Sequence, residues 1–96
     1  MGDAMRNLTV FQHKCESQLQ SILRNRNLNF FNQKLDGKKE MYIYGEVKGL
    51  EIWIYKDGAE IGGKNIDKRF EKDDFESEEE LIDAFKNEVE SLLESN

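Results

Sequence analysis

Between residues 41 and 61 apolar side chains alternate with other residues, and this alternation constrains the fold more than any other feature. A period of two is typical of strands that bury one face. Lys48-Gly49 and Asp57-Gly58 supply two-residue turns, so the segment is predicted to form an antiparallel meander. One face of that meander is aliphatic throughout and carries Met41, Ile43, Val47, Leu50, Ile52, Ile54 and Ile61.

The turns also predict which residues lie opposite each other on neighbouring strands. The first turn pairs Val47 with Leu50, Gly45 with Ile52 and Ile43 with Ile54. The second turn pairs Ile54 with Ile61 and places Gly62 opposite Trp53, where the ring can cover the glycine. The face opposite the aliphatic one then carries four rings in two cross-strand pairs, Tyr44 with Trp53 and Tyr42 with Tyr55.

Amphipathic helices are predicted before and after the strands. Apolar residues recur at spacings of three and four over residues 4–25 and again over residues 77–94. An aromatic and apolar run over residues 28–35 adds a further strand. The predicted fold is α+β: a helix, a three- or four-stranded antiparallel meander and a second helix, with both helices packed on the aliphatic face.

The chain of 96 residues fits one domain spanning residues 1–96. Residues 1–5 are interpreted as either a vector-derived leader or a disordered end. Residues 64–76 show no period, and their charge predicts an acidic loop.

The four rings admit two interpretations. Cross-strand aromatic pairs stabilise a sheet by roughly 0.2–1 kcal/mol each, and the 64–76 loop would cover them with Phe70 or Phe75, or one helix would pack on each side of the sheet. Alternatively, the rings form an open patch of the kind that marks binding or dimer surfaces. Tyr and Trp are also enriched where binding energy concentrates.

Carboxylates on the ring-bearing face indicate the chemistry of a partner. Glu46 and Glu51 are expected directly opposite each other, with Glu60 opposite Tyr55. Facing like charges destabilise a sheet unless a cation offsets them. Lys48 and Lys56, beside the two turns, are internal candidates for that cation. Otherwise, rings beside carboxylates favour the Arg and Lys side chains of a basic protein or peptide surface.

The net charge of -6 is unevenly distributed. Residues 1–56 carry +3 and residues 57–96 carry -9, with -6 in residues 71–80 alone. A capping box of Ser77 and Glu80 accounts for the acids at the start of the second helix. It does not account for Glu71, Asp73, Asp74 and Glu76, which are interpreted as a solvated loop or as a docking site for a basic partner. The residue spacing of a calcium loop is absent.

Several classes of function are disfavoured by the charges. A domain that neutralises phosphates carries a basic excess, so direct nucleic-acid binding is not expected. The order helix, strands, helix is shared with the double-stranded-RNA-binding domain, but Ser77-Glu78-Glu79-Glu80 would put acids against phosphates. No apolar run approaches the roughly 18–20 residues that cross a bilayer. No charged region followed by an apolar one starts the sequence, so secretion by that route is not expected. A cytoplasmic protein that binds no membrane is expected.

Catalytic groups are sparse. Cys15 falls on the apolar stripe of the first helix and is expected to be a small buried hydrophobic residue. His13 lies on the polar face of that helix with Ser17 one turn away, a pair that is usually inert on an exposed helix. One His and one Cys do not make a zinc site of familiar composition. We therefore expect no catalytic residues, no metal site and no cofactor.

The sequence predicts a small acidic, non-enzymatic binding module, an inhibitor or an immunity or anti-defence-like protein, that occupies a basic surface of a partner protein. The residues expected to bind the partner are Tyr42, Tyr44, Trp53, Tyr55, Glu46, Glu51, Asp73, Asp74 and Glu76. The alternative is a homodimeric assembly protein whose aromatic faces meet, so the chain is expected to be a monomer or a homodimer. A third hypothesis, a small-ligand or enzymatic site, requires a pocket with convergent polar groups.

Overall fold

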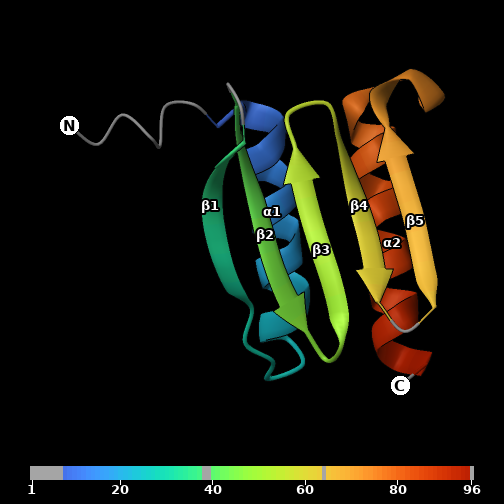
Figure 1. Cartoon of the computed structure of the whole chain (residues 1–96). Helices are drawn as coiled ribbons and strands as arrows, with labels where there is room; N and C mark the ends of the chain where they lie inside the picture. Colours follow the sequence, from blue (N-terminus) through green and yellow to red (C-terminus); the bar gives the residue numbers. More distant parts are fainter. Residues whose placement is uncertain (1–7, 38–39, 64, 96) are drawn as a thin grey trace.

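The chain folds into one antiparallel sheet with two helices on the same side of it (Figure 1). The computed structural model describes residues 8–37, 40–63 and 65–95. The five strands lie in the sheet in their order along the chain, β1 to β5. In chain order the elements are α1 (Val10–Arg24), β1 (Phe31–Gly37), β2 (Glu40–Val47), β3 (Leu50–Tyr55), β4 (Gly58–Gly63), β5 (Ile66–Glu71), the short 3-10 helix η2 (Lys72–Asp74) and α2 (Glu78–Ser95).

The α+β class and the antiparallel sheet are as predicted, but the sheet has five strands instead of three or four. Most of the predicted 64–76 loop is in fact β5 and η2. The strand escaped prediction because it lies at the sheet edge and only Ile66 and Phe70 pack against the core. Lys68 takes the central position on the helix side and pairs with Glu88 of α2, 3.3 Å away, so no apolar alternation marks the strand.

The register between β2 and β3 is the predicted one, with Ile43 opposite Ile54 and Val47 opposite Leu50. The predicted register between β3 and β4 is wrong by two residues, because the chain turns at Lys56-Asp57 and Tyr55 pairs with Gly58. Gly58 lies in β4 and not in the turn, and a glycine is needed there because a Cβ would overlap the carbonyl oxygen of Phe70 on β5. A shift of two residues leaves every side chain on its predicted face.

The core lies between the sheet and the two helices. Ile43, Ile52, Ile54 and Ile61 of the sheet are fully buried, as predicted for the aliphatic face. Against them pack the apolar stripes of the helices, Phe11, Cys15, Leu19, Ile22 and Leu23 of α1 and Leu81, Ile82, Phe85, Val89 and Leu93 of α2. One side of the sheet is therefore buried against the two helices.

Helix α1 begins at Val10 and not at residue 4, because Thr9 is its N-cap. The Thr9 hydroxyl accepts from the backbone N–H of Gln12, and the Gln12 side-chain oxygen accepts from the N–H of Thr9. The amide nitrogen of the fully buried Gln12 also donates to the carbonyl oxygens of Met41 (2.9 Å) and Ile54 (3.2 Å). One side chain thus caps the helix and attaches it to β2 and β3. The interpretation of residues 1–5 falls outside the described residues.

Candidate binding face

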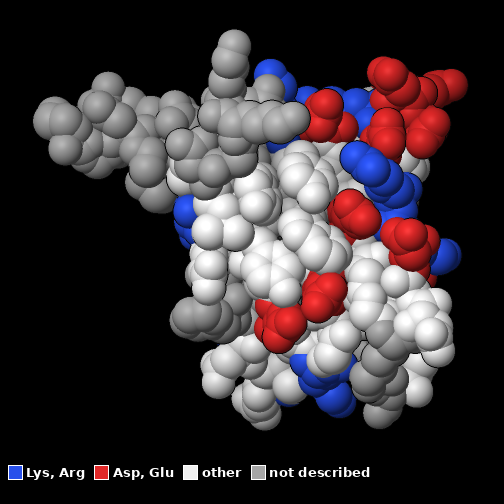
Figure 2. Space-filling model, in the orientation of Figure 1, with Lys and Arg blue, Asp and Glu red and all other residues white. Residues whose placement is uncertain are grey.

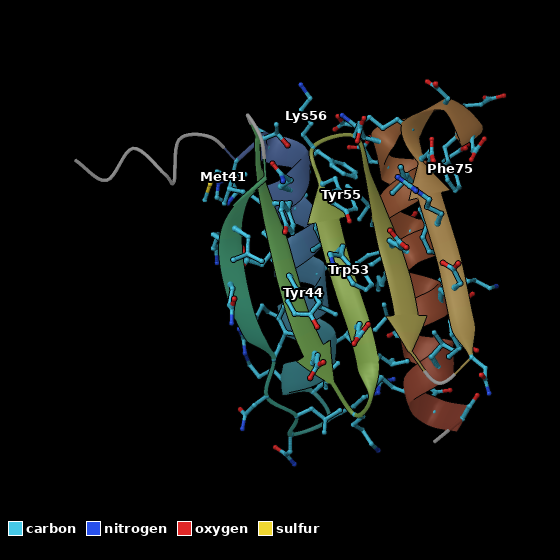
Figure 3. All side chains as sticks on the ribbon, viewed as in Figure 1. Met41, Tyr44, Trp53, Tyr55, Lys56 and Phe75 are labelled. Atoms are coloured by element: carbon cyan, nitrogen blue, oxygen red, sulfur yellow. The ribbon has the colours of Figure 1, made fainter. Side chains whose placement is uncertain are left out.

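The side of the sheet opposite the helices carries the four predicted rings, and we call these residues, Tyr42 and Tyr44 of β2 with Trp53 and Tyr55 of β3, the aromatic face. The rings of Tyr44 and Trp53 are tilted against each other with centroids 5.3 Å apart, and those of Tyr42 and Tyr55 lie 5.5 Å apart. Figure 3 shows Tyr44, Trp53 and Tyr55 projecting from the outer side of the two central strands. All four are partly exposed, so the predicted cross-strand pairs form without being buried.

None of the described segments covers this face. Both helices lie behind the sheet in Figure 1, which excludes one helix on each side. The other covering alternative is also wrong, because Phe70 and Phe75 stack on each other at 6.5 Å, and Phe70 packs edge-on against Phe85 of α2. The 64–76 segment extends the sheet sideways instead of folding over it, so among the described residues the aromatic face is open.

Carboxylates border the rings, and in Figure 2 acidic side chains lie to the right of and below the uncharged surface over the central strands. Glu46 and Glu51 are directly opposite each other, as predicted. Glu60 lies opposite Trp53 and not opposite Tyr55, a consequence of the shifted β3–β4 register. Glu46 accepts a hydrogen bond from the Tyr44 hydroxyl at 3.2 Å.

No cation of the described residues forms an ion pair with Glu46, Glu51 or Glu60. Lys48, expected as an internal counter-ion, pairs with none of them. Arg69 lies opposite Glu60 in the register, but its Nε is 3.2 Å from Glu71. Three carboxylates therefore stand beside exposed rings without a neutralising partner from the described part of the chain.

This negative charge acts on the tyrosines. Partial burial raises the pKa of Tyr44 above 10.0, and the hydrogen bond to Glu46 and the charges of Glu46 and Glu51 raise it further. Burial and then the charge of Glu60 raise the pKa of Tyr55, while Arg69 lowers it. The aromatic face is thus a neutral ring surface in a negative local field.

Gly62 is packed against the indole of Trp53. A Cβ on Gly62 would lie 3.2 Å from Cζ3 of Trp53, tighter than an ordinary contact. The predicted covering of Gly62 by Trp53 therefore occurs, although diagonally, because the register places Gly62 opposite Glu51. The absence of a side chain at Gly62 leaves room for the indole of Trp53 to extend over β4.

The remaining predicted partner residues, Asp73, Asp74 and Glu76, are exposed but do not join the aromatic face. They follow the end of β5 and precede α2, at the edge of the sheet (Figure 1). Ser77 caps α2 as predicted, its hydroxyl accepting from the N–H of Glu80 at 3.2 Å. The predicted capping box is only half formed, because the Glu80 carboxylate accepts from the N–H of Glu76 and not from that of Ser77. The neighbouring Lys72 is already used, pairing with Glu78 and lying 4.8 Å above the ring of Phe11.

Two charged residues on the outer side of the sheet, Asp67 and Arg69, were not predicted as site residues, and a third, Glu71, was interpreted as part of the acidic loop. Asp67, Arg69 and Glu71 of β5 lie opposite Gly62, Glu60 and Gly58, and so share the side of the aromatic face. Their place in the sheet was missed together with β5. The sequence signal that could have predicted β5 is the spacing of Ile66, Lys68 and Phe70 at every second position. That pattern indicates a strand only if Lys68 is allowed on the side that faces the helices.

The groups considered for catalysis are not assembled into a site. Cys15 is fully buried as predicted, and burial raises the pKa of its thiol from 9.0 to about 12. His13 and Ser17 share no hydrogen bond. Within residues 8–37, 40–63 and 65–95 no group of three His, Cys, Asp or Glu is arranged to hold a metal ion. The groove between α1 and α2, about 360 Å³, is lined by Lys14, Ser17, Gln18, Glu79, Ile82 and Asp83.

No helix in the described part of the chain combines the length and apolar character needed to span a bilayer. Comparison of the chain with protein-family models, with curated proteins and with solved structures finds no match.

Proposed function

We propose that this chain is a small acidic binding module, without enzymatic activity, that occupies a basic surface of a partner protein through its aromatic face. One observation carries the proposal. The open rings of Tyr44, Trp53 and Tyr55 are bordered by carboxylates that have no counter-ion among the described residues. A cationic partner surface offsets that charge and covers the rings at the same time.

The physical chemistry of such an interface favours this arrangement. Large rings supply contact area at a low entropic cost, and Trp and Tyr dominate binding energy in protein interfaces. Carboxylates around them steer a basic partner and pair with its side chains. Asp73, Asp74 and Glu76 lie outside the contact and add to the attraction at long range. Inhibitors and immunity or anti-defence proteins that occupy basic surfaces are the class we propose, by analogy of size and charge alone.

The test is a titration of the isotope-labelled protein with a peptide rich in both Arg and Lys, followed by NMR. We expect shifts concentrated on the outer side of β2 and β3, binding that weakens as salt rises, and at least a tenfold loss of affinity in Trp53→Ala. Asp83→Asn is the control, because it removes one exposed carboxylate on α2, away from this face. Unchanged binding in a folded Trp53→Ala protein would contradict the proposal.

A second copy of the chain is the other occupant that the aromatic face admits. Two such faces would bring Glu46 and Glu51 of each copy together, which opposes that dimer. Light scattering over a range of concentrations distinguishes the two. A mass that rises with concentration in the wild type, and stays monomeric in Trp53→Ala, would assign the face to self-association.

A further inference from the structure

We propose that Trp53, with Glu51 and Glu60, forms a subsite for an arginine side chain of the partner. This inference rests on the proposed function and names the group that the aromatic face recognises. The subsite is distinct from the general acidity of the chain, because it requires one ring and two particular carboxylates.

The sheet geometry brings these groups within the reach of one guanidinium. Glu60 lies directly opposite Trp53 on β4, and neighbouring strands are about 4.8 Å apart. Glu51 precedes Trp53 by two residues on β3, on the same face and about 7 Å along the strand. The Tyr44 ring borders the indole on its other side, with centroids 5.3 Å apart. The indole is therefore flanked by carboxylates on β3 and β4 and by a ring on β2.

A guanidinium fits this arrangement better than an ammonium. It is planar, so it stacks on an indole while its N–H groups point outward in its own plane, parallel to the ring. Those N–H groups can donate to two carboxylates at once, and charge-assisted bonds of this kind are stronger than neutral ones. A lysine ammonium is a compact, strongly hydrated charge that gains the electrostatic part alone. The subsite should therefore discriminate between the two basic residues.

The chain's own guanidinium nearest in the register does not fill the subsite. Arg69 is paired across β4–β5 with Glu60, but its Nε contacts Glu71 at 3.2 Å. It lies on the same side of the sheet, and its charge lowers the pKa of Tyr55. Arg69 is thus a competitor for the incoming arginine, and Arg69→Gln is expected to strengthen binding.

Gly62 positions the ring of the subsite. Its missing Cβ leaves room for Trp53, whose Cζ3 would lie 3.2 Å from that atom. Gly62→Ala keeps every charge and every ring, and its Cβ requires the indole of Trp53 to shift by a few tenths of an ångström. A purely electrostatic attraction would not respond to this change, whereas stacking on the indole would.

The experiment compares two synthetic peptides of equal length, an Arg-Gly repeat and a Lys-Gly repeat, by calorimetry. For the wild type we expect the Arg peptide to bind about tenfold more tightly. Trp53→Ala, Glu51→Gln, Glu60→Gln and Gly62→Ala should each bring the ratio of the two affinities towards one, and Asp83→Asn should leave it unchanged. Circular dichroism verifies that each variant is folded, and Arg69→Gln adds a variant whose expected effect is a gain.

The outcomes separate this inference from the proposed function. Equal affinity for the two peptides, with both lost in Trp53→Ala, would overturn the arginine subsite and leave the basic-surface function standing. A ratio near ten that survives both Glu51→Gln and Glu60→Gln would also overturn the subsite. Binding of neither peptide to the aromatic face would remove both proposals.

Discussion

The two sides of the sheet are formed by alternate residues of the same strands and differ in almost every physical respect. On the helix side, Ile52 and Ile54 of β3 are completely buried among aliphatic neighbours. On the outer side, Trp53 and Tyr55 of the same strand are partly exposed beside carboxylates that no cation of the described residues neutralises. Adjacent residues of one strand therefore have different roles: those on the helix side stabilise the fold and, in our proposal, those on the outer side bind a partner.

The largest expected loss of stability comes from a substitution on the helix side of the sheet. Ile52→Ala should lower the free energy of unfolding by about 2–5 kcal/mol, because it removes buried methyl groups and leaves a cavity. Trp53→Ala, one residue away, should cost about 1 kcal/mol or less, the worth of a cross-strand ring pair. Urea denaturation followed by circular dichroism measures both. Equal losses in the two variants would show that the aromatic face is part of the folding core.

A smaller effect is expected at the attachment of α1 to the helix side of the sheet. Gln12→Leu should cost about 1–3 kcal/mol, because the carbonyl oxygens of Met41 and Ile54 and the N–H of Thr9 lose their partner. Gln18→Leu, on the exposed side of the same helix, is the matched control and should change stability by less than about 0.5 kcal/mol. Comparable losses for the two would contradict the role given to Gln12.

The side of the sheet on which each residue of β2, β3 and β4 lies could be predicted from the sequence. It follows from the alternation of apolar residues and from the even number of residues in each turn. Every residue of the aromatic face was placed correctly because the β2–β3 register was predicted correctly. The misplaced β3–β4 turn still left Glu60 and Gly62 on the predicted side of the sheet, since a slip of two residues returns each side chain to its own face. What alternation could not supply was the pairing partner along the strand, and Glu60 was therefore assigned to Tyr55 instead of Trp53.

The elements that escaped prediction lack a local apolar signal. An edge strand such as β5 needs only two apolar contacts, with Lys68 between them, and pairing with β4 stabilises it. Gln12 reads as a polar-face residue of a helix, and only the positions of Met41 and Ile54 reveal that its amide is buried and satisfied. In both cases long-range backbone partners decide the outcome, and these are not visible in the local pattern.

Alkaline pH should act on the helix side through Cys15. Burial raises the pKa of the folded thiol to about 12 from 9.0, so the unfolded chain loses this proton first. The stabilising contribution is therefore complete below about pH 9 and is lost as the pH rises towards 12. Near pH 10.5 the loss is about 2 kcal/mol, from ~1.4 kcal/mol per pKa unit.

Urea denaturation of the wild type and Cys15→Ala at pH 7 and near pH 10.5 measures this contribution. The difference between the two pH values should be smaller in Cys15→Ala, and the tyrosines and lysines, common to both proteins, cancel. The same alkaline loss in both proteins would show that the thiol does not contribute.

The smallest expected effect on stability, and the sharpest contrast between the two sides, comes from Glu51→Gln. Removing one of two directly opposed carboxylates should stabilise the fold by a few tenths of a kcal/mol, because like charges facing across strands repel. It should also lower the pKa of Tyr44, which the charge of Glu51 raises, as measured by ultraviolet titration.

The same variant should bind the Arg-Gly peptide more weakly. On the helix side no substitution is expected to improve the fold while impairing binding. A gain in stability with a loss of binding is therefore specific to a surface whose charges are kept for a partner, and a loss of stability in Glu51→Gln would show instead that the carboxylate serves the sheet.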